Sequence, residues 1–388
     1  MKPKNSIYFR GIDSLRAIGA LSVLLGHLEL SKSSLQIPNL MHLPFYKNTS
    51  GHLGVLLFFV ISGFLITFLL LKEKQEFGKV DVLRFYYRRI LRIWPIYFLA
   101  LVLLFFVIPF VVPMDYYAKP DWSDPISLIP TLIIYFFIVP NFVSFGITGL
   151  GGGFHLGTIG TEEQFYLFWP WMIRKFSNLT FPLIWIIVGV TILPHGCDYL
   201  RLHYFINDPK FSKILEQTAN FFMYFKINSM AIGGILAWYY MNKNKVVTAI
   251  LYAKWIQIIA LLLGFGGWIV GFHLPIFNDE FYSLVFGIIL FNLATNPNSI
   301  FHLEIGILKY LGKISYGIYV YHWLVIYLVL GVIFPLAQST ISFNLIYYTL
   351  TISITLLVAH FSYHRIELRF LNLKQRVTYI QSQQSPHE

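Results

Sequence analysis

Residues suited to acid–base chemistry lie within an apolar stretch near the start of the chain. In residues 11–30, Asp13 and Arg16 precede His27. Arg16 and His27 are eleven positions apart, so on one helix they would lie near the same face at depths differing by roughly 16 Å. Histidine is the side chain best suited to take a proton from a hydroxyl group near neutral pH. The alternative is structural: Asp13 and Arg16 form a local pair, and His27 bonds a neighbouring carbonyl.

A cluster of arginines offers a different chemistry. Arg88, Arg89 and Arg92 are followed by Pro95, which we expect in the first turn of a helix. Arg89 and Arg92, three positions apart, should share a helix face. The planar guanidinium fork matches phosphate oxygens, so the cluster is suited to phosphate capture. The alternative is a topology signal that also attracts anionic lipid headgroups.

Two further groups combine acids, hydroxyls and a second histidine. Glu162 and Glu163 follow a glycine-rich stretch, where an acid could orient an imidazolium or bind a sugar hydroxyl; alternatively, Glu162 simply opens a helix. Ser315, Tyr319 and His322 are spaced by four and three positions, so they should share one helix face, for chemistry or for structural hydrogen bonds.

Composition indicates the elements that position these residues. Hydrophobic residues make up 56% of the 388 residues and charged residues 12%, about half the charged share of a typical soluble domain. The apolar runs are long enough for helices that cross a bilayer, and they lack the strict alternation of a barrel. The net charge of +11 comes from Lys and Arg in the connections between runs, so we expect a lipid bilayer and no nucleic acid as partner.

Counting the apolar segments predicts an all-α, polytopic membrane helix bundle. They cover roughly residues 12–30, 51–71, 94–113, 125–140, 162–176, 181–194, 219–241, 249–272, 280–296, 313–335 and 341–363. Positive residues flank the first and last segments, which predicts that both termini are cytoplasmic and that the number of crossings is even.

One of the eleven segments therefore cannot be a simple span. We expect about ten transmembrane helices and a re-entrant segment near 140–160, where glycines interrupt the apolar pattern. The chain should form one integral-membrane domain, 1–370, followed by a short polar cytoplasmic tail, 371–388. Lys374 in this tail is one of the positive residues that follow the last apolar segment.

Six short motifs occur in an order that is typical of one family. They are Asp13, Arg16 and His27; the run Gly54–Thr67; Arg88, Arg89, Arg92 and Pro95; Glu162, Gln164, Phe165 and Tyr166; Ser315, Tyr316, Tyr319 and His322; and Ser362, Tyr363 and Glu367. Taken together they resemble the membrane-bound acyltransferase family 3, whose members acylate carbohydrates and other acceptors. The sequence departs from that pattern in two places: Gly157, Thr158 and Ile159 replace Trp-Ser-Leu, and Arg369 replaces a proline.

The resemblance implies an O-acyltransferase of a bacterial inner membrane. Its donor would be acetyl-CoA or another acyl-CoA in the cytoplasm, its acceptor a carbohydrate or glycan hydroxyl, and it would need no metal. Some members carry a fused extracytoplasmic domain, and from the short sequence after the last apolar segment we expect none here.

The resemblance also assigns roles to residues. His27 would be the general base and Glu162 would orient it or bind the acceptor, in a water-filled chamber that joins them to the arginines. The donor would be held by Arg16, Arg88, Arg89 and Arg92; the residues expected to bind substrate are Asp13, Glu163, Tyr166, Ser315, Tyr319 and His322. The competing hypothesis is a proton-coupled secondary transporter or flippase that uses intramembrane His and Glu residues, although the sequence has no inverted repeat.

Overall fold

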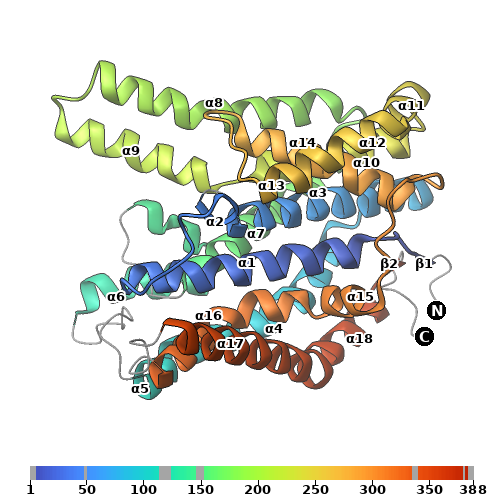
Figure 1. The fold of residues 1–388 in the computed structure, drawn as a ribbon. Helices are drawn as coiled ribbons and strands as arrows, with labels where there is room; N and C mark the ends of the chain where they lie inside the picture. The colour runs from blue at the N-terminus through green and yellow to red at the C-terminus, as the bar shows by residue number, and fades with distance from the viewer. Residues whose placement is uncertain are drawn as a thin grey trace.

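The computed structural model describes residues 6–47, 50–112, 124–145, 153–333, 340–378 and 381–382. This part of the chain is a bundle of helices, many of them long and lying side by side (Figure 1). Its only strands are β1 (Ser6–Ile7) and β2 (Gln381–Ser382), which pair in parallel near the two ends of the chain. The predicted all-α class is therefore confirmed.

Each of the eleven predicted apolar segments overlaps at least one helix. The long helices are α1 (Ile12–Ser34), α3 (Ser50–Phe77), α4 (Val82–Phe106), α7 (Gly157–Lys175), α8 (Thr180–His203), α10 (Ile227–Met241), α14 (Asn278–Thr295), α16 (Ser315–Ile333) and α17 (Thr340–Ser362). The shorter helices are α2 (Pro44–Lys47), α5 (Ile108–Val111), α6 (Pro125–Phe136), α9 (Pro209–Tyr224), α11 (Lys245–Tyr252), α12 (Lys254–Leu261), α13 (Gly267–Ile269), α15 (Gly306–Lys313) and α18 (Leu368–Arg376). Short 3₁₀ segments are η1 (Pro140–Phe145) and η2 (Phe154–Leu156), and short π segments are η3 (Leu262–Gly266) and η5 (Tyr363–Glu367).

The described residues contain six helices that are long and apolar enough to cross a membrane. They cover Gly51–Phe77, Val82–Val111, Thr180–His203, Pro209–Met241, Ser315–Ile333 and Ile341–Arg376. A pair bent by 59°, Lys245–Tyr252 with Lys254–Ile269, would make a seventh span. The chain is thus an integral membrane protein, while the predicted count of ten spans is not confirmed.

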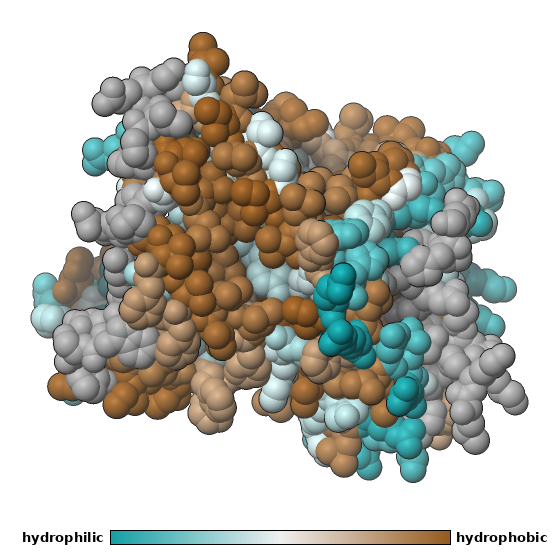
Figure 2. All heavy atoms as spheres, turned by 90° about the horizontal axis from the view of Figure 1, so that it is seen from below, coloured by the Kyte–Doolittle hydropathy of each residue, from teal (hydrophilic) through white to brown (hydrophobic). Residues whose placement is uncertain are grey.

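The surface has the polarity that a bilayer requires. In Figure 2, hydrophobic side chains cover the left and centre of the visible face, and hydrophilic ones gather on the right, the end at which Figure 1 places both termini. Apolar side chains that contact lipid need no hydrogen-bond partners, whereas charged ones are stable only beyond the hydrocarbon layer.

The predicted re-entrant segment is described only in part. Residues 146–152 lie outside the described residues, and the flanking segments form the 3₁₀ turns η1 and η2 instead of a continuous helix. The re-entrant path stays a prediction. Because α7 already begins at Gly157, the interpretation of Glu162 as an acid that opens a helix is wrong.

Glycines allow the helices around the future site to approach closely. A Cβ on Gly63 of α3 would collide with the main chain of Met230 on α10, and a Cβ on Gly312 of α15 would collide with the main chain at Asp13. Small residues at such crossings let backbones pack tightly where lipid supplies no hydrophobic driving force. This packing fixes α1 and α3 in the middle of the bundle.

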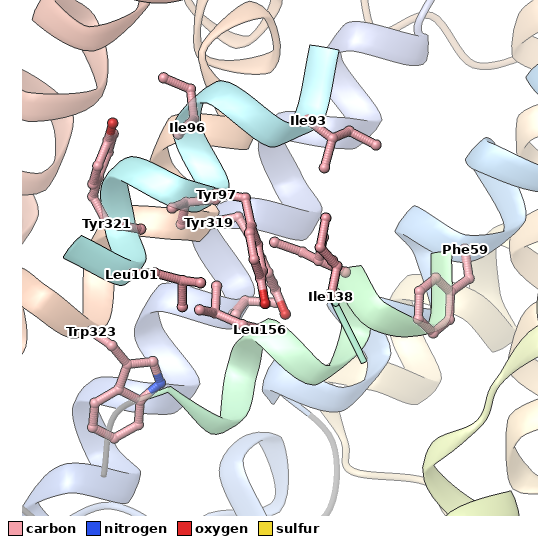
Figure 3. Packing of buried hydrophobic residues seen from close by; sticks show 14 of the residues in the cluster. Phe59, Ile93, Ile96, Tyr97, Leu101, Ile138, Leu156, Tyr319, Tyr321 and Trp323 are labelled. Atoms are coloured by element: carbon pink, nitrogen blue, oxygen red, sulfur yellow. The ribbon is translucent and has the colours of Figure 1, made fainter. Parts of the chain in front are cut away.

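A buried cluster of side chains joins α4, α16 and the η2–α7 segment. Figure 3 shows Tyr97, Tyr319 and Leu156 brought together from these three elements. The hydroxyl of Tyr97 also donates a hydrogen bond of 2.8 Å to the carbonyl of Tyr135, so a polar group in this core is satisfied. The cluster holds in place the helices that carry the predicted site residues.

Candidate active site

Five helices, α1, α3, α4, α7 and α16, enclose a cavity with a volume of about 100 Å³. Its polar and charged lining residues are Arg16, Ser62, Arg89, Arg92, Thr158, Glu162, Tyr166, Ser315, Tyr316 and Tyr319. Three guanidinium groups thus face one carboxylate. Such a cavity attracts an anion, because a buried charge is stable only when it is paired or solvated.

The arginines reach the cavity from two helices. Arg89 and Arg92 lie on the same face of α4, as their spacing predicts, and Arg16 enters from α1 while its Nη1 lies 3.3 Å from Oδ1 of Asp13. Arg89 is 8% exposed; its guanidinium lies over the ring of Tyr166 at 5.6 Å, and its Nε has no partner. Within the described chain, Arg92 forms no ion pair or hydrogen bond. These donors are therefore available to a ligand.

The start of α4 differs from the expectation. Asp81 caps the helix by accepting a 3.1 Å hydrogen bond from the backbone N–H of Arg84, so α4 begins before the arginines and Pro95 lies in its interior. The prediction of Pro95 in the first turn is wrong. In the turn containing this proline, Tyr316 of α16 donates a hydrogen bond of 2.8 Å to the carbonyl of Ile93.

The two acids of α7 have different surroundings. The carboxylate of Glu162 accepts hydrogen bonds from Ser62 at 2.8 Å and from Tyr166 at 2.9 Å, and it faces the cavity. Glu163 points elsewhere, with one oxygen 3.3 Å from the indole nitrogen of Trp94. Glu162 therefore lies with the arginines, and its bonds do not reach His27.

Arg88 differs from its neighbour Arg89. Its Nη2 lies 2.9 Å from Oε2 of Glu73, and both residues are buried. Glu73 also accepts a hydrogen bond of 2.8 Å from the backbone N–H of Asp81. Arg88 is thus paired inside the protein and does not line the cavity, which leaves it poorly placed for the donor-binding role that we expected.

His27 and His322 form a hydrogen-bonded pair. Nδ1 of His27 lies 2.7 Å from Nε2 of His322, and Nδ1 of His322 lies 2.6 Å from the carbonyl oxygen of Tyr319. A third ring, His155 of η2, lies 4.9 Å from that of His322. Two nitrogens that share a tetrahedral zinc, with bonds of roughly 2.0–2.1 Å, would be more than about 3 Å apart, so the pair is a hydrogen bond and not a shared metal site.

The cavity ends at Tyr319, before it reaches the histidine pair. The ring of Tyr319 lines the cavity and lies 5.8 Å from the ring of His322. Its hydroxyl donates a 2.7 Å hydrogen bond to the carbonyl of His155 and also contacts the hydroxyl of Thr158. His27 does not line the cavity. The described cavity therefore does not extend to His27, and the continuous chamber stays a prediction.

The structure divides the predicted residues into three groups. Those that line the cavity are Arg16, Arg89, Arg92, Glu162, Tyr166, Ser315 and Tyr319; those in the histidine pair are His27 and His322; those that do not line the cavity and bond to other side chains are Asp13, Arg88 and Glu163.

Sequence reasoning also missed site residues. Ser62 and Tyr316 belong to two of the family motifs, but the sequence does not show which residues they bond, because their partners lie on other helices. From the sequence, Lys374 is expected only in the positive tail. It lies on α18, which packs against α4, within electrostatic reach of Arg89 and Arg92. His155, beside the glycine-rich stretch, is also a missed residue. As a histidine next to a predicted site segment, it could have been identified from the sequence.

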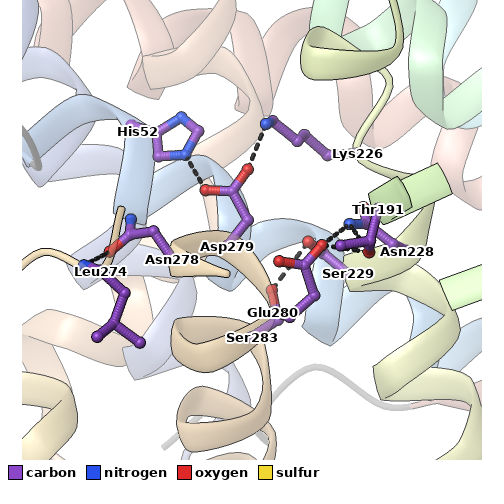
Figure 4. A network of polar contacts seen from close by, with 10 residues as sticks. All are labelled: His52, Thr191, Lys226, Asn228, Ser229, Leu274, Asn278, Asp279, Glu280 and Ser283. Atoms are coloured by element: carbon purple, nitrogen blue, oxygen red, sulfur yellow. Dashed lines mark hydrogen bonds and ion pairs between the residues drawn. The ribbon is translucent and has the colours of Figure 1, made fainter. Parts of the chain in front are cut away.

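A second polar cluster lies on the other side of α3. Figure 4 shows Asp279, at the start of α14, between His52 of α3 and Lys226. The next residue, Glu280, accepts hydrogen bonds from Thr191 at 2.5 Å and from Asn228 at 2.6 Å. Here each carboxylate is bonded to other side chains of the protein.

Comparison with known proteins identifies the class. Residues 9–360 match the model of the Acyl_transf_3 family, whose description is acyltransferase domain. The chain therefore belongs to this family of acyltransferases, and the resemblance drawn from the motifs is confirmed.

Two curated relatives are more specifically named. O-acetyltransferase OatA of Staphylococcus aureus (strain NCTC 8325 / PS 47) is 28% identical over 377 residues, which cover 93% of this chain and 57% of the relative. The OatA protein of strain COL gives the same values. The chain thus spans little more than half the length of these relatives. No solved structure matches it.

Proposed function

We propose that this protein is a membrane O-acyltransferase that moves an acyl group, by default acetyl, from acyl-CoA to a hydroxyl of a carbohydrate or glycan. The observation that carries the proposal is the convergence of Arg16, Arg89 and Arg92 around one cavity whose lining includes Tyr319. The ring of Tyr319 lies 5.8 Å from that of His322, the hydrogen-bonded partner of His27. The names of the relatives support transfer of acetyl to oxygen.

The cavity is suited to part of the donor. A cavity of about 150 Å³ accommodates benzene, so one of about 100 Å³ admits a small group such as a phosphate or the acyl end of a thioester. The rest of the donor would extend towards the end of the bundle where the arginines and Lys374 lie. Guanidinium groups would bind its phosphates through charge-assisted hydrogen bonds.

The transfer itself would take place at His27. Its imidazole takes the proton of the acceptor hydroxyl while the hydroxyl oxygen attacks the thioester carbonyl. The carbon–sulfur bond then breaks, and the proton leaves with the thiol. Because Tyr319 lies between the cavity and the histidines, its side chain must turn aside for the thioester to reach them. Glu162, held by Ser62 and Tyr166, would position the arginines.

The proposed topology follows from charge. Positive residues near the ends of the chain and the bacterial origin of the relatives favour a bacterial inner membrane with both termini cytoplasmic. The donor would then enter from the cytoplasmic side, at the end of α1 that carries Arg16.

The test is thioester consumption by the purified, full-length protein in lipid nanodiscs. With acetyl-CoA and a panel of glycan acceptors, the wild type should release free thiol and yield an ester product. His27→Ala should lower kcat on the order of 10²–10⁴-fold, the usual contribution of a general base.

A matched control is His302→Ala, which changes a histidine far from His27 in the chain and outside the cavity lining. It should retain wild-type kcat. Full activity of His27→Ala would contradict the proposal, and uptake of a solute by vesicles without thiol release would instead favour the transporter hypothesis.

A further inference from the structure

The hydrogen bonds of His322 determine where its proton lies. A carbonyl oxygen can only accept, so the 2.6 Å contact with Tyr319 requires a proton on Nδ1 of His322. His322 is 1% exposed, and among the described residues no Asp or Glu bonds to either ring of the pair. A buried charge without a counter-ion is costly, so the resting ring is neutral and its Nε2 carries a lone pair.

The same logic then fixes the proton of His27. Since Nε2 of His322 is an acceptor, the 2.7 Å contact requires a proton on Nδ1 of His27. A neutral imidazole has only one proton, which leaves the lone pair of His27 on Nε2. The chain of bonds therefore begins at a backbone carbonyl, passes through two rings, and ends in a free basic nitrogen.

That nitrogen faces a position without a side chain. A Cβ placed on Gly51 of α3 would lie 3.9 Å from Nε2 of His27. The rings of Phe154 and Trp323 lie 5.6 and 5.2 Å from the imidazole and surround it on other sides. The geometry thus leaves Nε2 uncovered by hydrogen-bond donors of the described chain.

We propose that His322 is a positioning residue: through the carbonyl of Tyr319 it holds His27 as the Nδ1–H tautomer, with the Nε2 lone pair directed at the acceptor hydroxyl. This inference rests on the proposed function and replaces the substrate-binding role first expected for His322. When Nε2 takes the hydroxyl proton, the Nδ1 proton of His27 shifts towards His322, and the pair shares the positive charge until the departing thiolate is protonated.

Two substitutions of His322 separate this role from a merely structural one. In His322→Gln the side-chain amide oxygen reaches the place of Nε2 and can still accept from His27. In His322→Asn the shorter amide can still bond the carbonyl of Tyr319 but does not reach His27. We expect His322→Asn to lower kcat on the order of 10²–10⁴-fold and His322→Gln to remain within roughly tenfold of the wild type, with the donor KM unchanged in both.

A second readout does not depend on turnover. ¹⁵N NMR of histidine-labelled protein in nanodiscs, with His27→Ala to assign the signals, should show His27 protonated at Nδ1 in the wild type and in His322→Gln. In His322→Asn it should show a mixture of tautomers.

Several results would overturn the inference. They are wild-type activity of His322→Asn, equal losses in both variants with a lowered melting temperature, a change in KM instead of kcat, or an Nε2–H tautomer in the wild type. If the wild type releases no thiol from any acyl-CoA, the proposed function fails, whereas the spectrum still decides the tautomer.

Discussion

Two groups of buried charges in this protein differ in one respect, the presence of partners. At the far end of α1 from Arg16, Lys32 and Glu29 are 1% and 0% exposed, with Nζ of Lys32 2.5 Å from Oε1 of Glu29 and 2.9 Å from Asn344. Tyr348 and the backbone of Leu40 donate to the same carboxylate. Every charged atom there has a partner, as around Asp279 (Figure 4).

Two of the three arginines of the cavity lack such partners, whereas Arg16 is paired with Asp13. Arg89 has an unbonded Nε, and Arg92 forms no ion pair in the described chain. A bundle that satisfies Lys32 so completely could also satisfy these groups, so their exposure to a cavity indicates a ligand. For Arg89 and Arg92 it is the lack of partners, and not burial alone, that indicates a functional charge.

The largest expected effect comes from breaking the buried pair of Lys32 and Glu29. Lys32→Met should lower the free energy of unfolding by about 3–5 kcal/mol, because it leaves Glu29 buried without its cation. Adding Glu29→Gln should restore most of the loss, and kcat per folded molecule should not change. Thermal unfolding in detergent measures the first effect and thiol release the second; a loss of kcat without a change in stability would show that the pair is functional.

A smaller effect sharpens the comparison between neighbours on α4. Arg89→Gln should raise the donor KM by about 10- to 150-fold, because a charge-assisted hydrogen bond contributes roughly 1.5–3 kcal/mol, and it should leave the melting temperature nearly unchanged. Arg88→Gln is the matched control. It should lower the melting temperature, because Glu73 stays buried without its cation, and it should change the donor KM little. A raised donor KM in Arg88→Gln and a lowered melting temperature in Arg89→Gln would instead assign donor binding to Arg88 and the structural role to Arg89.

The smallest expected effect concerns Lys374, which lies near Arg89 and Arg92 but does not line the cavity. Lys374→Gln on α18 should raise the donor KM up to roughly fivefold, since a partly exposed charge contributes at most about 1 kcal/mol. The increase should diminish at high salt. Lys245→Gln, on the short helix α11, is the control and should leave KM unaltered. An effect of Lys374→Gln on kcat alone would exclude a role in donor binding.

The sequence by itself determined the relations within single helices. Each of its eleven apolar runs overlaps at least one helix, because a helix in lipid needs an uninterrupted stretch of apolar side chains. The period of the helix placed Arg89 with Arg92, and Ser315 with Tyr319, on faces that line the cavity. The order of short motifs identified the family.

Only the tertiary structure decided which side chains meet across helices. The bond between His27 and His322 joins residues 295 positions apart, and the partner of Arg88, Glu73, lies on the preceding helix. No periodicity encodes these contacts, because they depend on how closely glycines such as Gly63 let the helices pack. The same packing placed Tyr319 between the arginines and the histidines, since the direction of a side chain into a shared space is set by all the helices around it.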